Sequence, residues 1–318
     1  MIQVENLVKR YGQHIAIDQL NFTVNKGEIL GFLGPNGAGK STTMNIITGY
    51  ISATSGSVKI NGRDILEEPQ AAKRCIGYLP EFPPLYGEMT VKEYLDFVGE
   101  IKHISPQTKQ ADFDKIIDLV KIEAVWNRLI KNLSKGYKQR IGLAQALIGN
   151  PEVLILDEPT VGLDPKQIIE IRNLIKDLGK EHTIILSSHI LPEVSAVCER
   201  LIIINKGKIV ASDTPENLSR NLSASSKLSL RVAGPKDQVM SILSKLSGVK
   251  EILLQGIKEP DTVDILIEAE KDTDLRRPIF NALSQANYPI LMMRSLDLTL
   301  EDIFLHVTTE EEHLEEVS

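Results

Sequence analysis

One motif limits the fold of this chain more than any other, the segment GFLGPNGAGKST around residue 40. Gly34 and Gly39 are separated by four residues and followed by Lys40 and Ser41, which is the GxxxxGK[ST] pattern of a phosphate-binding loop. The apolar run EILGFL precedes the loop and a helical pattern, TTMNIITGY, follows it. Backbone N–H groups and a helix N-terminus would then converge on one anion. This strand, loop and helix predict an α/β fold that binds phosphate.

The chemistry of this loop assigns roles to its side chains. Lys40 would reach the β- and γ-phosphates of a nucleotide as a point charge, and the Ser41 hydroxyl would complete the coordination of Mg²⁺. The residues expected to surround the phosphates are Gly34, Pro35, Asn36, Gly37, Ala38, Gly39, Lys40, Ser41 and Thr42.

A second polar group follows the apolar run VLILD. Asp157 would end a buried strand at the edge of the sheet where ligands bind, and a carboxylate there can hold Mg²⁺ directly or through water. Glu158 is placed to accept a proton from water that attacks the γ-phosphate, which contributes about 10²- to 10⁴-fold in rate. A plain pair of surface carboxylates is the alternative, and the phosphate loop favours the catalytic interpretation.

The apolar patterning divides the first 220 residues into three parts. Short strands with turn signals fill the chain up to about residue 66. Helical periodicity begins with a capping box at Thr90 and Glu93, and predicts a helical insert over about 86–149. Short buried strands return at 153–157, 183–188 and 201–205 with a helix near 165–178, which predicts a parallel sheet.

The composition changes at 215–226, where serines and asparagines accumulate, and we expect a domain boundary there. The remaining patterns follow the order βαββαβ, which predicts a small α+β domain of ferredoxin-like type over 227–308. Within it, TLEDIFLHVT predicts a short final helix. The tail, 309–318, holds five glutamates and is expected to be disordered.

Composition excludes several functional classes. With 42% hydrophobic and 25% charged residues, the chain is typical of a soluble globular protein. A formal net charge of −7 provides no basic field for nucleic acid or anionic lipid. Cys75 and Cys198 lack metal-binding spacing, which fits a reducing cytoplasm. The N-terminus does not resemble a secretory signal, and no apolar run approaches the ~20 residues that span a bilayer. If the protein serves a membrane, another chain is expected to span it.

Five motifs in order resemble the ATP-binding-cassette ATPases: GPNGAGKST, LSKGYKQR at 133–140, ILDEPT, GLDP at 162–165 and SSH at 187–189. The resemblance covers about residues 1–220. It implies an ATPase cassette with an antiparallel β subdomain and a helical subdomain, and ATP and Mg²⁺ as ligands. It also implies that two chains enclose two nucleotides between them.

The same resemblance assigns further residues. Ser134 and the backbone of Gly136 would contact the γ-phosphate held by the partner subunit, and Asp164 would lie in the loop that links the two sites. His189 would sense and orient the γ-phosphate, and Tyr11 would stack on adenine. For Tyr11 and His189 an ordinary core position is the alternative.

Two motifs depart from the family pattern. The usual LSGGQ is LSKGY here, so Lys135 replaces a glycine and Tyr137 replaces the glutamine. In GYLPE, Glu81 replaces the usual glutamine; its carboxylate can face Mg²⁺ but adds negative charge near the phosphates. The residues expected to act in catalysis are Glu158, His189 and Glu81, and those expected to hold the metal are Ser41, Asp157 and Glu81.

Two further segments bear on partners. In FPPLYGEM, the side chains of Phe82, Leu85, Tyr86 and Met89 lack core periodicity, and we expect them to receive a helix of a membrane subunit, with ordinary loop packing as the alternative. A basic run spans 128–140; because no aromatic series accompanies it, we interpret it as a solvated helical face and expect no nucleic-acid partner.

The sequence therefore predicts the ATP-hydrolysing subunit of an exporter, resembling drug, lipid or gliding-motility types. It would bind the cytoplasmic side of the cell membrane through a separate multi-span subunit, as a homodimer or a heterodimer of related chains. An alternative of another class is a cassette ATPase that acts on ribosomes or nucleic acid; one phosphate loop and no long heptad run oppose it. A sugar-importer ATPase would carry a barrel-like extension instead of βαββαβ.

Overall fold

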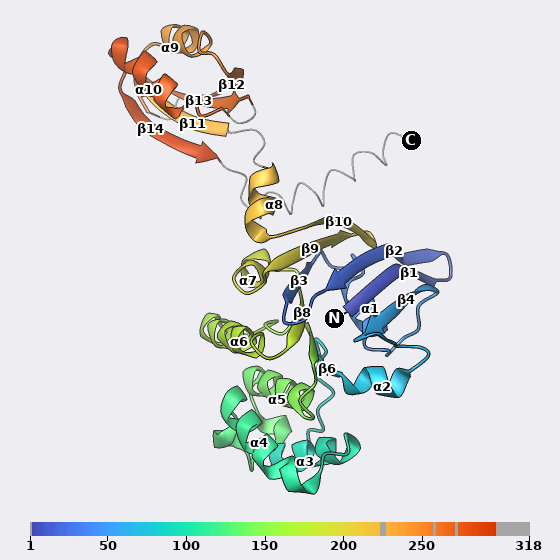
Figure 1. Cartoon of the computed structure of the whole chain (residues 1–318). Coiled ribbons are helices and arrows are strands. Elements are labelled where there is room, and N and C mark those ends of the chain that lie inside the picture. Colours follow the sequence, from blue (N-terminus) through green and yellow to red (C-terminus); the bar gives the residue numbers. More distant parts are fainter. Residues whose placement is uncertain (1, 223–226, 257–258, 271–272, 297–318) are drawn as a thin grey trace. The chain divides into compact units, whose positions relative to one another are not determined.

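The computed structural model describes residues 2–222, 227–256, 259–270 and 273–296 (Figure 1). They fall into two compact units, one ending at Pro215 and the other beginning at Glu216. The predicted final helix and the acidic tail lie outside the described residues. Within those residues, no helix is long and apolar enough to cross a membrane.

The first unit contains two sheets. Their strands are β1 (Ile2–Tyr11), β2 (His14–Val24), β3 (Ile29–Leu33), β4 (Ser55–Ile60), β5 (Arg63–Asp64), β6 (Ile76–Leu79), β7 (Val153–Asp157), β8 (Thr183–Ser188), β9 (Arg200–Asn205) and β10 (Lys208–Asp213). The four-stranded sheet has the order β2-β1-β4-β5 with antiparallel pairs, and the six-stranded sheet has the order β10-β9-β3-β8-β7-β6. All pairs from β9 to β6 are parallel, so the predicted α/β class is confirmed.

The helices of this unit follow the predicted division. They are α1 (Lys40–Ile47), α2 (Pro69–Arg74), α3 (Val91–Ile101), α4 (Pro106–Val120), α5 (Lys135–Leu147), α6 (Pro165–Leu178) and α7 (Leu191–Ser195), with 3₁₀ turns at Glu123–Val125 and Ile130–Asn132. The capping box at Thr90 and Glu93 starts α3 as the sequence predicts. Helices α3, α4 and α5 lie together at the lower end of Figure 1.

The core joins the two sheets around α1. Met44 and Ile47 of α1 are fully buried in one cluster with Val4 of β1 and Ile155 and Ile185 of the parallel strands. Because α1 is packed on both sides, its N-terminus is fixed relative to the carboxyl ends of β3, β7 and β8. That edge of the sheet is where the sequence places its polar motifs.

The second unit has the expected element order. After α8 (Pro215–Leu222) come β11 (Lys227–Ala233), α9 (Lys236–Leu243), β12 (Val249–Gly256), β13 (Thr262–Ala269), α10 (Arg276–Gln285) and β14 (Ile290–Leu296). The antiparallel sheet has the order β12-β13-β11-β14. Its assignment to the ferredoxin-like type remains our interpretation of this topology.

One helix of the second unit ends earlier than the sequence predicts. Helical periodicity from Pro235 predicts a helix to about Leu246, whereas α9 ends at Leu243. The chain turns toward β12 at Gly248, which has a positive φ of 89°, and a Cβ there would lie 2.6 Å from Cγ2 of Thr273.

Candidate functional site

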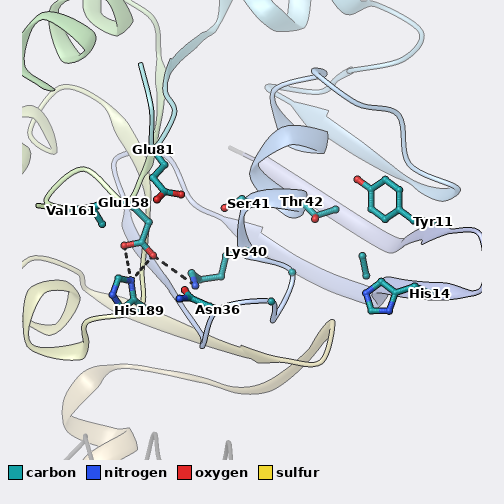
Figure 2. A pocket seen from close by; sticks show the side chains of 13 residues that line it. Tyr11, His14, Asn36, Lys40, Ser41, Thr42, Glu81, Glu158, Val161 and His189 are labelled. Carbon is teal, nitrogen blue, oxygen red and sulfur yellow. Dashed lines mark hydrogen bonds and ion pairs between the residues drawn. The ribbon is translucent and has the colours of Figure 1, made fainter. Parts of the chain in front are cut away.

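A cavity of about 550 Å³ opens where β3 meets α1 (Figure 2). This volume is in the range of small-molecule sites. Its lining is Tyr11, His14, Ala16, Asn36, Gly37, Gly39, Lys40, Ser41, Thr42, Glu81, Glu158, Val161 and His189. The structure therefore brings the phosphate loop, Tyr11, Glu81, Glu158 and His189 to one place. His14, Ala16 and Val161 also line the cavity, but no motif in the sequence indicates them.

Two glycines allow the loop to pass close to other backbone. A Cβ on Gly34 would lie 2.5 Å from the carbonyl oxygen of Ile204, and one on Gly39 would lie 2.6 Å from that of Ala16. Gly39 also has a φ of 106°, in the left-handed region, where it is the N-cap of α1. The loop is thus fixed against β9 and β2, and the first turn of α1 begins at Lys40.

Lys40 is buried among oxygen atoms. Its Nζ donates to the carbonyls of Gly34 (2.7 Å) and Pro35 (3.1 Å) and lies 3.7 Å from Oε1 of Glu158. Burial lowers the pKa of this ammonium below its ordinary value, and the nearby carboxylates, Glu158 first, act against that shift. The same carboxylates include Asp157 and Glu81, so one buried cation faces three acidic groups.

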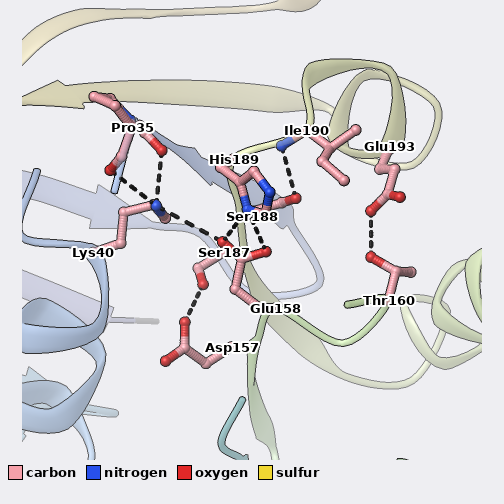
Figure 3. A network of polar contacts seen from close by, with 11 residues as sticks. Pro35, Lys40, Asp157, Glu158, Thr160, Ser187, Ser188, His189, Ile190 and Glu193 are labelled. Carbon is pink, nitrogen blue, oxygen red and sulfur yellow. Dashed lines mark hydrogen bonds and ion pairs between the residues drawn. The ribbon is translucent and has the colours of Figure 1, made fainter. Parts of the chain in front are cut away.

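Asp157 ends β7 as predicted and is only 2% exposed. It lies opposite Ser187 in the pairing of β7 with β8, and the Ser187 hydroxyl donates to its Oδ1 (Figure 3). This bond fixes one carboxylate oxygen. Ser187 was not a predicted site residue, although it stands in the SSH motif.

Glu158 adopts a left-handed backbone conformation, with φ of 50°, which is uncommon for a residue with a side chain. Its N–H donates to the carbonyl of Ser187 (3.1 Å). Its carboxylate oxygens lie 2.9 and 3.0 Å from Nδ1 of His189 (Figure 2). The side chain of His189 is 40% exposed and faces the cavity, so the core alternative for this residue is wrong.

Tyr11 lies on the rim of the cavity. Its side chain is 51% exposed, and the ammonium of Lys9 lies 5.1 Å from the centre of its ring. A buried core tyrosine, the alternative interpretation, is therefore wrong. The open ring face is compatible with stacking against a flat ligand.

Seven predicted residues are not in the cavity lining. Gly34, Pro35 and Ala38 belong to the phosphate loop and Asp157 ends β7, whereas Ser134, Gly136 and Asp164 lie at the N-termini of two other helices. Ser134 is the N-cap of α5 and accepts from the N–H of Tyr137, and Asp164 caps α6 in a capping box with Gln167. A Cβ on Gly136 would lie 2.8 Å from the Gln167 side chain, so the two helix N-termini are neighbours. The chain does not bring them to its own phosphate loop.

A second cavity of about 530 Å³ lies beside the first. Its lining is Asn45, Tyr50, Ile76, Tyr78, Pro80, Phe82, Pro84, Lys102, Gln145 and Ala146, and we call it the aromatic groove. Phe82 is 73% exposed in it. The other singled-out aromatic, Tyr86, instead packs against Tyr94 and Phe97 of α3. Of the four predicted contact residues, Phe82 is the one in the groove lining.

The basic run at 128–140 is not a solvated face throughout. Arg140 is 9% exposed, donates to the carbonyl of Val120 (2.9 Å) and pairs with Glu170 of α6. Its guanidinium joins α4, α5 and α6, and the expectation of a solvated side chain at this position is wrong. No sequence signal near Arg140 indicates this partner, which lies in another helix.

The fold and the site together define a phosphate-loop ATPase cassette. The family model described as ABC transporter matches residues 17–161. The linearmycin resistance ATP-binding protein LnrL of Bacillus subtilis (strain 168) is 31% identical, covering 97% of this chain and 98% of LnrL. The bacitracin transport ATP-binding protein BcrA of Bacillus licheniformis is 41% identical, covering 66% and 68%.

Solved structures agree with these relatives. The dimeric cassette MJ0796 in a post-hydrolysis state with ADP and Pi has a TM-score of 0.62 and 26% identity, covering 67% of this chain and 98% of that one. The chain therefore belongs to the ABC transporter family, as one of its ATP-binding subunits, and it hydrolyses ATP. These relatives favour the transporter interpretation over an ATPase of ribosomes or nucleic acid.

Proposed function

We propose that the chain powers a membrane exporter, with two cassettes closing around ATP. One observation carries the catalytic part. One cavity is lined by the phosphate loop with Lys40, by Glu158 and by His189, and the Glu158 carboxylate contacts the side chains of Lys40 and His189. In this proposal Lys40 binds the β- and γ-phosphates, Glu158 takes a proton from the attacking water, and His189 orients the γ-phosphate. Tyr11 stacks on adenine.

Mg²⁺ fits the donor set of the cavity. Glu158 lies 3.7 Å from the Lys40 ammonium, and Asp157 and Glu81 are near enough to raise the pKa of Lys40 as well. Negative charge therefore exceeds positive charge here, and a divalent cation would balance it. Oxygen donors are the ligands Mg²⁺ prefers. Ser41, Asp157 and Glu81 would hold the ion, which supplies charge neutralisation for the phosphates when bound. A carboxylate at position 81 strengthens this site relative to the glutamine of the family pattern.

A second subunit would complete the site. Ser134, Gly136 and Asp164 lie outside the chain's own cavity, and two adjoining helix N-termini form a suitable surface for a phosphate held by another copy. The dimeric MJ0796 cassette supports this arrangement. The second chain would be an identical copy or a related cassette.

We further propose that the aromatic groove receives a helix of a separate membrane subunit. Its open aromatic side chains suit the helix-in-groove mode of recognition. The strand β6 leads into both cavities, because Glu81 lines the nucleotide cavity while Pro80 and Phe82 line the groove. Such a contact would place the protein on the inner face of the cell membrane.

Export is favoured by the antibiotic resistance and transport named for LnrL and BcrA. The ATP-binding domain would extend over 1–220, with its helical subdomain at about 86–149. An accessory domain would follow over 227–308, and a tail over 309–318. The match to LnrL along nearly its whole length supports an accessory domain common to both proteins, which would serve dimerisation, regulation or docking of a partner.

Glu158→Gln tests the catalytic proposal. We expect hydrolysis to fall by about 10²- to 10⁴-fold while ATP binding is retained, because the side chain keeps its shape but loses its basicity. Size-exclusion chromatography with ATP should show dimers accumulating. Glu181→Gln, an exposed carboxamide exchange before β8, is the matched control. Wild-type turnover in Glu158→Gln would refute the assignment.

Affinity purification tests the membrane proposal. The tagged protein is recovered from detergent-solubilised membranes of its own cells, and co-purifying chains are identified by mass spectrometry. We expect a stoichiometric multi-span chain that is lost in Phe82→Ala and kept in Phe280→Ala, an exposed aromatic of the second unit. Ribosomal or DNA-bound partners with no membrane chain would overturn the proposal.

A further inference from the structure

A third side-chain contact joins the two segments that carry Glu158 and His189. These segments follow β7 and β8, which are neighbours in the sheet. Asp157 binds Ser187 and Glu158 binds His189; further along, the Thr160 hydroxyl donates to Oε2 of Glu193 in α7 (Figure 3). This last bond is the most distant from the sheet, where no strand pairing holds the backbone.

Both members of this pair are buried. Thr160 is 5% exposed and Glu193 is 7% exposed, and neither lines the nucleotide cavity. Among the described residues, Thr160 is the one hydrogen-bond or ion-pair partner of the Glu193 carboxylate. Burial of a carboxylate with a single hydroxyl partner costs folding free energy. Such a group therefore indicates a role other than stability.

The pair is placed where it controls geometry. The Thr160 carbonyl accepts from the N–H of Leu163 (3.2 Å), so Thr160 also anchors the turn that leads to Asp164. On the other side, the Ser188 hydroxyl accepts from the N–H of Ile190, and Glu193 lies in the next turn. Glu158 has a left-handed backbone conformation, which a residue with a side chain adopts only when the surrounding structure holds it there. The position of its carboxylate therefore depends on such anchors.

We propose that Glu193 is a positioning residue for ATP hydrolysis. Through Thr160 it holds the segment that carries Glu158 against the segment that carries His189, and so keeps the two catalytic side chains in contact. The proposal rests on the catalytic roles given above. It concerns the rate of the chemical step and not the affinity for nucleotide, since neither residue touches the cavity.

Steady-state ATP hydrolysis by the purified full chain tests it. We expect Thr160→Val and Glu193→Ala each to lower kcat by about 10- to 100-fold, the size of effect that a small misplacement causes, with KM changed less than about twofold. Thr160→Ser and Glu193→Gln, which retain a donor and an acceptor, should stay near the wild-type kcat. Ser195→Ala is the matched control, because it removes a buried α7 hydroxyl that has no hydrogen-bond partner among the described residues.

A double variant separates positioning from simple burial. Thr160→Val with Glu193→Met removes both polar groups at similar volume, which should restore thermal stability. We expect kcat to remain as low as in the worse single variant, since the cross-link is still missing. Recovery of kcat together with stability, an effect no larger than that of Ser195→Ala, or a rise in KM alone would each overturn the proposal. If Glu158→Gln keeps wild-type turnover, the catalytic roles on which this proposal rests fail instead.

Discussion

Charged side chains are arranged differently beside the cavity of the first unit and on the sheet of the second. In the first unit, three carboxylates face the single ammonium of Lys40 beside an open cavity. In the second, Asp264 is 2% exposed and its Oδ1 lies 3.0 Å from Nε of Arg231. Glu268 likewise contacts Lys250 at 2.5 Å and Lys227 at 3.6 Å. Charges that are matched within the chain support the fold, whereas an unmatched group beside a cavity indicates a ligand that supplies the missing charge.

The largest effect should come from removing Lys40, the cation that lies among these carboxylates. We expect Lys40→Ala to lower ATP hydrolysis by about 10³-fold, because the charge that stabilises the transferring phosphoryl group is lost. Lys250→Ala removes a lysine from the second unit and should leave the rate within about twofold. Hydrolysis rates at saturating ATP check both. Similar losses in the two variants would break the distinction between ligand-directed and structural charges.

The second effect concerns the core of the second unit. Ile265 on β13 is fully buried, and we expect Ile265→Ala to reduce the free energy of unfolding of that unit by about 2–5 kcal/mol. The rate of ATP hydrolysis per folded molecule should be unchanged, because no described residue of this unit lines the nucleotide cavity. Calorimetry together with an activity assay measures both, and Leu254→Ala, at an exposed position, is the control. A parallel loss of activity would show that the two units work as one.

A smaller effect is expected at the rim of the cavity. Tyr11→Ala should raise KM for ATP by about 2- to 10-fold with kcat unchanged, since a stacking contact contributes about 0.5–1.5 kcal/mol to binding. Tyr11→Phe should behave like the wild type. Phe280→Ala, an exposed aromatic of the second unit, gives the baseline. If kcat falls and KM is constant, Tyr11 does not bind the base.

The sequence was sufficient where function and local structure share one segment. The loop from Gly34 to Ser41 contains the glycines of its turn, the first residues of the helix and the lysine that binds phosphate in one short segment. Likewise, the apolar run VLIL and the two acidic residues that follow it indicate that Asp157 and Glu158 lie at the end of a strand. The order of elements in the second unit also followed from apolar periodicity, because each strand and helix there is short and bounded by turn residues.

Contacts between distant segments were not predictable in this way. Ser187 meets Asp157 and Glu193 meets Thr160 only because β7 and β8 pair in one particular register, which no local pattern states. The basic run predicts an exposed Arg140, but this side chain is buried because it pairs with Glu170 in a later helix. Tyr86 stands near Phe82 in the sequence but packs on α3 instead of the groove. In each case tertiary packing decided the outcome.

The smallest effect tests an exposed, matched charge. Arg276 binds the side chain of Asp274 and lowers the pKa of that carboxyl to about 2. Because the folded pKa lies below the unfolded value, the carboxylate stabilises the second unit above about pH 4, and this contribution is lost as the pH falls toward 2. We expect Asp274→Asn to lower the Tm of that unit by about one or two degrees at pH 7, since exposed pairs contribute little. The difference in Tm between the wild type and Asp274→Asn should shrink as the pH approaches 2, and high salt should reduce it as well.

A difference in Tm that persists unchanged at low pH would mean that Asp274 contributes through its hydrogen bonds and not through its charge. That result would weaken the view that matched charges in this unit act through electrostatics.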